Sequence, residues 1–315
     1  MAFFIMVEYK IPRCQIVPQS DFATSITVDG REVLRWNFGH HFPRPFFHPV
    51  IGPSGVNLVR MGHPGAPNHD HHMGIWFAHS MLDEFNFWAN GTGTQIRQRQ
   101  WLDYIDGDSF AAMAVILDYY DGHNDEPIIN QETIVVIRPL IGKEYLIDLH
   151  LRLKPTQNEV TLHQSNFGVL AVRVASSVSE YFGGGIITND QGSQREANIF
   201  GKASSYMDYS GPVRRSGEGQ VINGITVYDH PKNPNFPSKW HVREDGWMGP
   251  SLNRDKALAL VEKQSLYLRY QLHVHDGKFD PPRAAELRES FSQSRAWHVT
   301  KSTDKHRSWE ILPGV

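Results

Sequence analysis

The chain has 315 residues, of which 40% are hydrophobic and 21% are charged, a balance typical of a globular protein rather than a disordered or fibrous one. The formal net charge is -3 and no basic run is present, so the composition argues against a nucleic-acid surface and no nucleic-acid partner is expected. The single cysteine, Cys14, excludes an intrachain disulfide.

No stretch approaches the roughly 18–20 apolar residues of a membrane-spanning helix, so no membrane partner is expected. The N-terminal run 2–7 is apolar, but it is too short for the core of a signal peptide, and Glu8 follows it directly. The sequence therefore predicts a soluble protein of the cytoplasm, or of the periplasm if a leader precedes the sequence shown.

The first 60 residues predict short strands joined by turns. Asp29-Gly30 lies between two runs of alternating residues, which is typical of a β-hairpin, and we expect one over 24–36. Segment 44–50 also resembles a strand, but it contains two prolines, which lack the N–H that a central strand donates. We therefore expect this segment outside the middle of a sheet.

The middle of the chain continues the β pattern. Further strands are expected at 95–101, 111–119, 132–138, 145–154, 167–174 and 222–228. Segment 145–154 alternates most cleanly, with apolar side chains at its odd-numbered positions and mostly polar ones between them. The Asn223-Gly224 pair inside the last of these segments predicts a second hairpin turn.

The segment 263–275 is another cleanly alternating strand. Its polar side is formed by Tyr267, Arg269, Gln271, His273 and His275. An antiparallel sheet commonly leaves one face wet, and a wet face of this composition is expected to contact a ligand.

A convincing helical period appears only at 283–291, and strands and helices do not alternate along the chain. The sequence therefore predicts an all-β fold, a large antiparallel β-sandwich with a short C-terminal helix, as a single domain over 1–315.

The segment 68–79, which we call the His loop, is the densest group of histidines. It contains His69, His71, His72 and His79, and His48 and His63 precede it. Imidazole can act as an acid, a base or a metal ligand near neutral pH, and a loop beside aromatic residues is typical of a pocket. Three interpretations are open: proton-transferring imidazoles, a metal site with His69 and His71 as ligands, or a structural cluster. Because no His-Glu-x-x-His motif or cysteine ligand accompanies it, no cofactor is expected, and a divalent metal is the alternative.

A second polar segment, 228–243, contains three prolines, at 231, 234 and 237, which stiffen it. Asp229 could orient the imidazole of His230, Trp240 could stack on a ligand, and Arg243 could pair with a carboxylate or with hydroxyl groups. The alternative is a rigid loop with ordinary surface charges.

Arg173 lies within an apolar strand segment, 167–175. An arginine among apolar residues is seldom buried without a partner, so Arg173 is expected either to pair with an acid or to face a ligand groove.

Several motifs together resemble one known family. They are found at 44–49, 68–79, 85–88, 167–173, 229–231 and 240–243. In this combination they resemble, over roughly residues 20–290, the bacterial domain family named after the methane oxygenase subunit PmoA. The family pattern has Asp at the position of Asn68 and Arg at that of Met73, so a role that needs a charge there does not carry over.

The resemblance implies a β-rich fold similar to the galactose-mutarotase supersandwich, with a sugar bound on one concave sheet face. It does not imply methane oxidation, because the methane enzyme is a membrane protein and this chain has no membrane span. His, Arg, Trp and acidic side chains would line the sugar site, with stacking and acid/base chemistry as its tools.

The sequence thus predicts a carbohydrate-active enzyme with a small-molecule or oligosaccharide substrate. A lyase or epimerase is favoured, because no pair of acids stands out for hydrolysis. The alternatives are a metal-dependent, oxygenase-like enzyme and a non-catalytic sugar-binding module. The expected catalytic residues are His71, His72, His230 and His241. The expected substrate-binding residues are His48, His69, Trp76, His79, Arg173, Asp229, Trp240, Arg243, Arg269 and His273.

Overall fold

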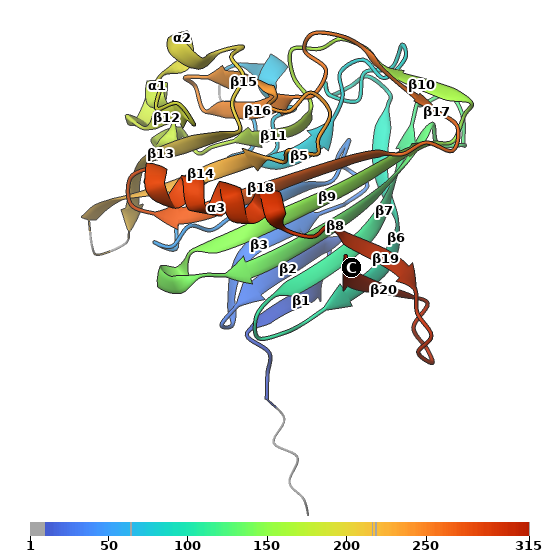
Figure 1. Ribbon diagram of the computed structural model, residues 1–315, viewed down its shortest axis with the longest axis horizontal. Coiled ribbons are helices and arrows are strands. Elements are labelled where there is room, and N and C mark those ends of the chain that lie inside the picture. The colour runs from blue at the N-terminus through green and yellow to red at the C-terminus, as the bar shows by residue number, and fades with distance from the viewer. Residues whose placement is uncertain (1–9, 64, 216, 218, 315) are drawn as a thin grey trace, which may run out of the picture.

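The computed structural model describes residues 10–314 with the exception of 64, 216 and 218. Within these residues, the fold is built mainly of antiparallel strands, most of which lie in two eight-stranded sheets (Figure 1). The all-β prediction is therefore confirmed. The apolar run 2–7 and both ends of the expected domain lie outside the described residues. None of the described helices is both long enough and apolar enough to span a bilayer.

The first sheet has the strand order β1-β2-β3-β4-β5-β11-β16-β15. Its strands are β1 Cys14–Gln19, β2 Ala23–Val28, β3 Arg31–Asn37, β4 Phe46–Val50, β5 Ile75–Ala78, β11 Val169–Arg173, β15 Lys239–Arg243 and β16 Trp247–Ser251. The predicted hairpin over 24–36 is confirmed as β2 and β3. Asp29 and Gly30 both have positive φ, 51° and 73°, which the tight turn between these strands requires.

The second sheet has the strand order β12-β13-β14-β18-β9-β8-β7-β6. Its strands are β6 Gln95–Ile105, β7 Ala111–Tyr120, β8 Ile129–Pro139, β9 Tyr145–Pro155, β12 Ile186–Asn189, β13 Tyr206–Arg215, β14 Gly219–Asp229 and β18 Leu266–Asp276. Two further sheets have two strands each: one pairs β10 Glu159–Leu162 with β17 Leu258–Val261, and the other pairs β19 Trp297–Lys301 with β20 Trp309–Pro313. The helical elements are α1 Glu180–Gly183, α2 Glu196–Ile199, α3 Pro281–Gln293, and the short turns η1 Pro67–His69, η2 Ile141–Lys143 and η3 Ser176–Val178.

The two large sheets share one hydrophobic core. Alternate apolar residues of β9 and β18 belong to the same buried cluster as Trp36, Phe47 and Ile75 of the first sheet. This arrangement follows from the period of two along a strand, which sends every second side chain to the same face. The core of the β-sandwich therefore lies where the alternating patterns predict it.

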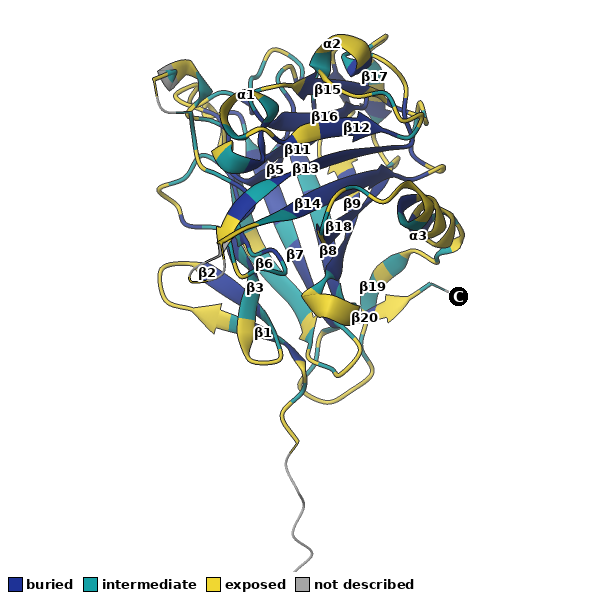
Figure 2. Ribbon diagram, turned by 90° about the vertical axis from the view of Figure 1, so that its left-hand side faces the viewer, coloured by how far each residue is buried: buried dark blue, intermediate teal, exposed yellow. Residues whose placement is uncertain are grey.

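Helix α3 covers part of the outer face of the second sheet (Figures 1 and 2). Asp280 caps its first turn by accepting a hydrogen bond from the Arg283 N–H, and Ala284, Leu287 and Phe291 bury one stripe of the helix against the sheet. The predicted C-terminal helix is confirmed.

This helix changes the surroundings of the polar side of β18. Arg269, Gln271, His273 and His275 are all buried, whereas Tyr267 is 59% exposed. The expectation of a wet face is therefore wrong for these four residues. These four side chains are buried because α3 and the chain that follows it pack on this side of the sheet. The alternation in β18 alone does not reveal that packing.

The expectation that prolines keep 44–50 out of the middle of a sheet is also wrong. The strand β4 is the fourth of eight in the first sheet. Pro49 lies where the register between β3 and β4 shifts, and β4 pairs with β5 only through Phe46 and Phe47. The N–H that Pro49 lacks is therefore not needed by either neighbouring strand.

The predicted turn at Asn223-Gly224 is likewise wrong, because both residues lie within the long strand β14. A Cβ atom on Gly224 would come within 2.4 Å of Ser210 Oγ and 2.5 Å of His275 Nε2, so glycine permits a close approach of side chains from both neighbouring strands. Asn223 Nδ2 donates to Asp276 Oδ1 at 2.8 Å. The Asn-Gly pair thus serves packing between strands rather than chain reversal.

Candidate active site

A cleft of about 630 Å³ is lined in part by the first half of the His loop, including His69, His71 and His72. Its lining comes from the chain on both sides of β5, from β11 with the residues before it, and from β15 and β16. The lining residues are Asn68, His69, His71, His72, Ser80, Asn86, Trp88, Ala89, Phe167, Arg173, His241, Arg243, Asp245 and Trp247. The structure thus brings together six of the predicted site residues from three distant parts of the chain.

The His loop is held in place by its backbone and by one buried arginine. Gly74 has a φ of 58°, and a Cβ there would lie 2.2 Å from the Phe47 carbonyl oxygen, so only glycine fits where the loop enters β5. The Arg44 guanidinium is buried and donates to the carbonyls of His71, at 3.2 Å, and of Ala89, at 2.9 Å. Arg44 therefore ties the His loop to the segment after β5.

The imidazoles of the His loop form a cluster. The ring centroid of His72 lies 4.3 Å from that of His71 and 5.1 Å from that of His69. Burial and the Arg44 charge lower the pKa of His71 to about 4, and burial also lowers the pKa of His69 and, further, that of His72. All three rings are therefore neutral at pH 7. The Nδ1 atoms of His69 and His72 are buried without a hydrogen-bond partner, so the cluster has unused polar atoms.

An aromatic cluster extends from the His loop to β15. The Trp88 ring lies 6.3 Å from His71, 4.7 Å from Phe167 and 6.0 Å from Trp247. The His241 ring packs edge-on against Trp247, with centroids 4.2 Å apart. The neutral imidazoles of His71, His72 and His241 thus contact different parts of one aromatic surface.

The hydrogen bonding of His241 fixes its tautomer. Its Nδ1 donates to the Asn166 carbonyl oxygen at 3.3 Å, which leaves the lone pair on Nε2. Burial and the Arg243 charge lower the pKa of His241 to about 3, so this ring too is neutral at pH 7. His241 can therefore accept a proton through Nε2.

Arg173 and Asp245 form the charged part of the cleft. Arg173 Nη1 lies 2.6 Å from Asp245 Oδ1, Nη2 lies 3.1 Å from Oδ2, and the arginine side chain is fully buried. Burial alone would raise the pKa of Asp245, but the hydrogen bonds and charge of Arg173 outweigh it and hold the pKa below its usual value. Asp245 therefore stays ionised near neutral pH.

Arg243 is a second cation of the cleft and is half-exposed. Its Nη1 donates to Glu196 Oε1 at 2.6 Å, and its guanidinium lies 4.9 Å from the centre of the Phe200 ring. These contacts orient Arg243 while leaving part of it accessible to a ligand.

The alternative interpretation of the His loop is a metal site with His69 and His71 as ligands. In the described part of the chain, no three His, Cys, Asp or Glu side chains are arranged to hold one metal ion. His69 and His71, the expected ligand pair, have ring centroids 6.1 Å apart.

Comparison with known protein families gives one match. Residues 23–289 match the model of a family of unknown function, DUF6807. The chain belongs to this family. The match gives no support to the PmoA-type family name that the motifs suggested. No curated protein matches the chain in sequence.

Two solved structures are similar to this DUF6807 chain at low identity. One is a 4-alpha-glucanotransferase from Thermococcus litoralis, with 11% identity and a TM-score of 0.30 over 85% of this chain and 40% of that one. The other is a GalM/aldose epimerase homologue from C. elegans, with 8% identity and a TM-score of 0.32 over 84% and 99%. The chain thus spans less than half the length of the glucanotransferase. Similarities this low identify no activity for the DUF6807 chain.

Two of the predicted stacking residues do not line the cleft. Trp76 is fully buried beneath it and stacks on His72, with ring centroids 5.4 Å apart. Trp240 is also fully buried, and its indole N–H donates to the Ser204 carbonyl at 2.8 Å. Trp88, Trp247 and Phe167 line the cleft instead, and of these three rings only that of Phe167 is not fully buried.

His48 and His79 have structural partners in this DUF6807 fold. His79 Nδ1 accepts from the Met81 N–H at 3.1 Å, so its Nε2–H donates to Asn253 Oδ1 at 2.9 Å. His48 Nε2 accepts from Asn57 Nδ2 at 3.1 Å. Neither ring lines the cleft.

The remaining predicted residues lie on the second sheet. Asp229 is buried, accepts from Asn233 Nδ2 at 2.7 Å, and has a pKa raised by burial to about 6. His230 Nε2 lies 2.8 Å from Arg269 Nη1, and burial together with the Arg269 charge lowers the pKa of His230 to about 4. The structure therefore places Asp229, His230 and Arg269 in a buried network, separate from the residues that line the cleft.

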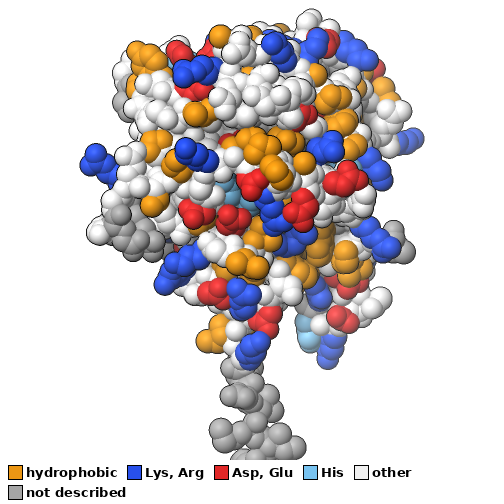
Figure 3. Space-filling view, turned by 60° about the vertical axis from the view of Figure 1, so that its left-hand side comes forward, with side chains coloured by type: hydrophobic (Ala, Val, Ile, Leu, Met, Phe, Trp, Pro, Cys, Tyr) orange, Lys and Arg blue, Asp and Glu red, His pale blue; other side chains and the backbone are white. Residues whose placement is uncertain are grey.

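His273 belongs to another buried group on the same sheet. It lies 2.9 Å from Glu144 Oε2, and its ring centroid is 5.2 Å from that of His275. A cavity of about 140 Å³ is lined in part by Glu144, His273 and His275. Figure 3 shows acidic, basic and histidine side chains gathered in a hollow on the side of the molecule that it brings forward.

Sequence reasoning missed Asp245, Trp247 and Phe167 as lining residues of the cleft. Glu244-Asp245-Gly246 is the turn between β15 and β16, Trp247 is the first residue of β16, and Gly246 has a φ of 103°. A signal was present, because an Asp-Gly pair between two strands predicts a turn beside Arg243. Trp88 was part of the aromatic run noted after the His loop.

Proposed function

We propose that the cleft is the active site of an enzyme that acts on a carbohydrate by imidazole acid/base chemistry, as a lyase or an epimerase. The observation that carries this proposal is the placement of neutral imidazoles, from the His loop and from β15, around one aromatic surface. Both reaction types need a base that removes a proton from carbon and an acid that returns or donates one.

The aromatic surface suits a sugar ring. The half-buried ring of Phe167 and the edges of Trp88 and Trp247 line the cleft and offer apolar contacts for the C–H groups of a sugar. The volume of about 630 Å³ lies within the usual range for small-ligand pockets, about 300–1,000 Å³. A mono- or disaccharide would fill such a space.

The proton transfers can be written with these residues. His241 Nε2 removes the proton on a carbon next to a carbonyl or carboxyl group, and Arg243 stabilises the negative charge that develops on oxygen. In a lyase, the electrons of the broken C–H bond form a C=C bond while the neighbouring C–O bond breaks. The leaving oxygen then receives a proton from His71, which must enter this step as imidazolium; because the pKa of His71 is about 4, we expect turnover to rise as pH falls towards that value. In an epimerase, the same imidazole returns a proton to the opposite face of the carbon.

Hydrolysis with two carboxylates fits the cleft less well. That reaction needs two carboxyl groups about 5–9.5 Å apart, one of them protonated. Among the described residues that line the cleft, Asp245 is the one carboxylate, and its pair with Arg173 keeps it ionised. The proposed reaction therefore uses imidazole rather than carboxylic acid as the proton donor.

The test is a screen of neutral and acidic mono- and oligosaccharides with the purified protein. Elimination is followed by absorbance of the unsaturated product, and epimerisation by exchange of the substrate C–H with deuterium in NMR. His71→Gln and His241→Gln are expected to reduce turnover by about 100-fold or more. The exposed His163 serves as the control, because His163→Gln leaves the cleft intact.

The outcomes separate the proposal from its alternatives. Sugar binding without turnover in any form of the protein would indicate a binding module and overturn the catalytic proposal. Turnover that follows bound metal and is lost on treatment with a chelator would overturn the metal-free mechanism. Loss of turnover in both histidine variants with retained binding would support the proposal.

A further inference from the structure

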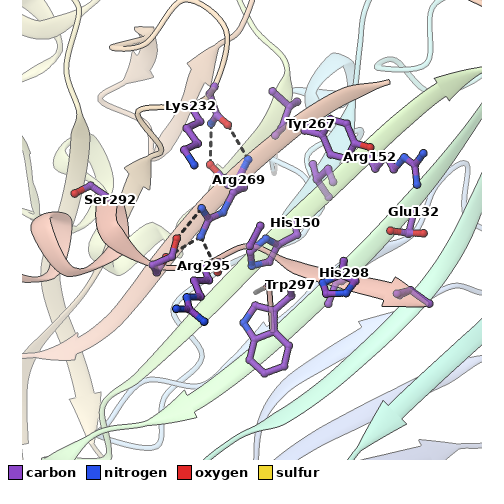
Figure 4. Close-up of a pocket in the computed structure, with 18 of the residues that line it drawn as sticks. Glu132, His150, Arg152, Lys232, Tyr267, Arg269, Ser292, Arg295, Trp297 and His298 are labelled. Carbon is purple, nitrogen blue, oxygen red and sulfur yellow. Dashed lines mark hydrogen bonds between the residues drawn. The ribbon is translucent and has the colours of Figure 1, made fainter. Parts of the chain in front are cut away.

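We propose that a second pocket, on the outer face of the second sheet, binds an anionic sugar unit. Its volume is about 550 Å³, and we call it the β18–β19 pocket. Its walls come from β8, β9 and β18, from Lys232 and Asn233, and from the chain 292–299 that links α3 to β19 (Figure 4). It shares no lining residue with the cleft, so this proposal does not rest on the proposed function.

The lining of the β18–β19 pocket is strongly cationic. It contains four cationic side chains, from Arg152, Lys232, Arg269 and Arg295, and one acidic side chain, from Glu132. Within the described part of the chain, Lys232 and Arg295 form no ion pair with a carboxylate. Burial raises the pKa of Glu132, and the charge of the neighbouring Arg152 opposes that rise. A pocket of this charge is expected to attract an anion.

His150 has unused hydrogen-bonding capacity in the middle of this pocket. Its ring is 6% exposed, and both Nδ1 and Nε2 are buried without a partner. Figure 4 shows the ring among Arg269, Trp297 and His298. Burial of two unsatisfied polar atoms is costly, and a ligand that supplies one acceptor and one donor would remove that cost. A carboxylate or phosphate oxygen beside a hydroxyl group has this chemistry.

Arg269 is held rigidly at the edge of the pocket. Its Nη1 donates to the Ser294 carbonyl at 3.0 Å, and its Nη2 donates to Ser294 Oγ at 2.7 Å and to the Arg295 carbonyl at 3.2 Å. These bonds fix the wall that carries Arg295 against the sheet. A wall that is already ordered loses little entropy when a ligand binds.

Two aromatic side chains give the pocket a preference for a ring. Tyr267 is 59% exposed, with the Arg152 guanidinium 5.4 Å from its ring centre. Trp297 is half-buried and packs on Phe110, with centroids 5.1 Å apart. Cations beside aromatic faces suit a charged sugar better than a simple inorganic ion. A sugar carboxylate and a sugar phosphate share this chemistry.

The experiment measures binding of glucuronate, glucose 6-phosphate, glucose and inorganic phosphate to the full chain by calorimetry and by NMR of the histidine rings. We expect the two anionic sugars to bind and to shift the His150 signals, and we expect glucose to bind at least 10-fold more weakly. Stronger binding of glucuronate or of glucose 6-phosphate identifies the charged group. If inorganic phosphate binds as tightly as the two anionic sugars, the pocket binds an adventitious ion only, and the proposal is overturned.

The variants test the assignment of residues. Lys232→Ala combined with Arg295→Ala is expected to weaken binding of the anionic sugars by at least 10-fold, and both side chains are exposed, so folding is spared. Lys154→Ala is the matched control, because Lys154 is an exposed cation on β9 outside the pocket, and less than a 2-fold change is expected. An equal effect of the control, or no effect of the double variant, would overturn the proposal. His71→Gln is expected to leave this binding unchanged, which keeps the test separate from that of the cleft.

Discussion

The buried guanidinium of Arg173 forms a two-point ion pair with Asp245, and this pair joins the end of β11 to the turn between β15 and β16. It connects residues far apart in the sequence and fixes the charged part of the cleft. From the sequence, Arg173 is expected either to pair with an acid or to face a ligand groove. In the structure it does both, because it pairs with Asp245 and lines the cleft.

Removal of the carboxylate charge is expected to destabilise the fold. Asp245→Asn keeps the shape of the side chain but leaves the Arg173 charge buried without a counter-ion, at a cost of about 3 kcal/mol. Unfolding in urea, followed by tryptophan fluorescence, measures the change. Glu196→Gln is the control, because its partner Arg243 is half-exposed and the loss of such a pair costs less than about 1 kcal/mol. Equal losses in the two variants would show that burial of Arg173 does not govern the energetics.

Gly74 is expected to be indispensable for the position of the His loop. Gly74→Ala would force a Cβ to within 2.2 Å of the Phe47 carbonyl oxygen, so β4 and β5 must separate, and we expect a loss of more than about 3 kcal/mol. Gly65 also has a positive φ, of 80°, but its Cβ would meet open space, so Gly65→Ala is expected to cost only about 1–2 kcal/mol. Thermal and urea unfolding of both variants tests whether the close contact, rather than φ, decides the effect.

The ion pair of His275 with Asp208 is expected to make stability depend on pH. Burial alone would lower the pKa of His275, but the charge and hydrogen bond of Asp208, at 2.9 Å, outweigh it and raise the pKa above its usual value. The contribution of this pair is therefore complete below about pH 6.5 and is lost as pH rises through the folded-state pKa. His275→Gln is expected to cost about 2 kcal/mol at pH 6 and less at pH 9. A cost that is equal at the two pH values, or larger at pH 9, would contradict the assignment.

The sequence predicted the strands well because the alternation of apolar and polar residues is itself the cause of the sandwich. The residues that fill the core from β9 and β18 are those that the alternation selects. The sequence-based prediction failed at Pro49 and at Asn223-Gly224. Whether these residues lie within a strand depends on the register of the neighbouring strands. A local motif contains no information about which strand lies beside it.

The candidate site was predictable only where it is local in sequence. The clustering of His69, His71 and His72 is a property of a single loop, so the sequence displays it directly. Asp245 is more than 160 positions beyond that loop, and although its Asp-Gly pair predicts a turn, nothing local shows that this turn faces the His loop. His230 and Arg269 do not reach the cleft, because α3 and the chain after it bury them in a network of their own.

Acid is expected to destabilise the protein through its buried neutral histidines, and His150 gives the sharpest test. Burial and the Arg269 charge lower the pKa of His150 to about 3, whereas an unfolded histidine titrates near 6.5. As pH falls below 6.5 the unfolded state takes up a proton that the folded state does not, so stability is lost between pH 6.5 and 3.

At pH 5 this single site is expected to lower the free energy of unfolding by about 2 kcal/mol relative to pH 7.5. His150→Asn removes the titrating group, so the difference between the two pH values should shrink by that amount, as measured by urea unfolding at each pH. His298, an exposed histidine of the same pocket, provides the control, because His298→Asn is expected to leave the difference unchanged. If the free energy of unfolding of His150→Asn still differs between pH 5 and pH 7.5 as much as that of the original protein, the buried ring must be protonated in the folded state. The β18–β19 pocket would then hold a charged imidazole.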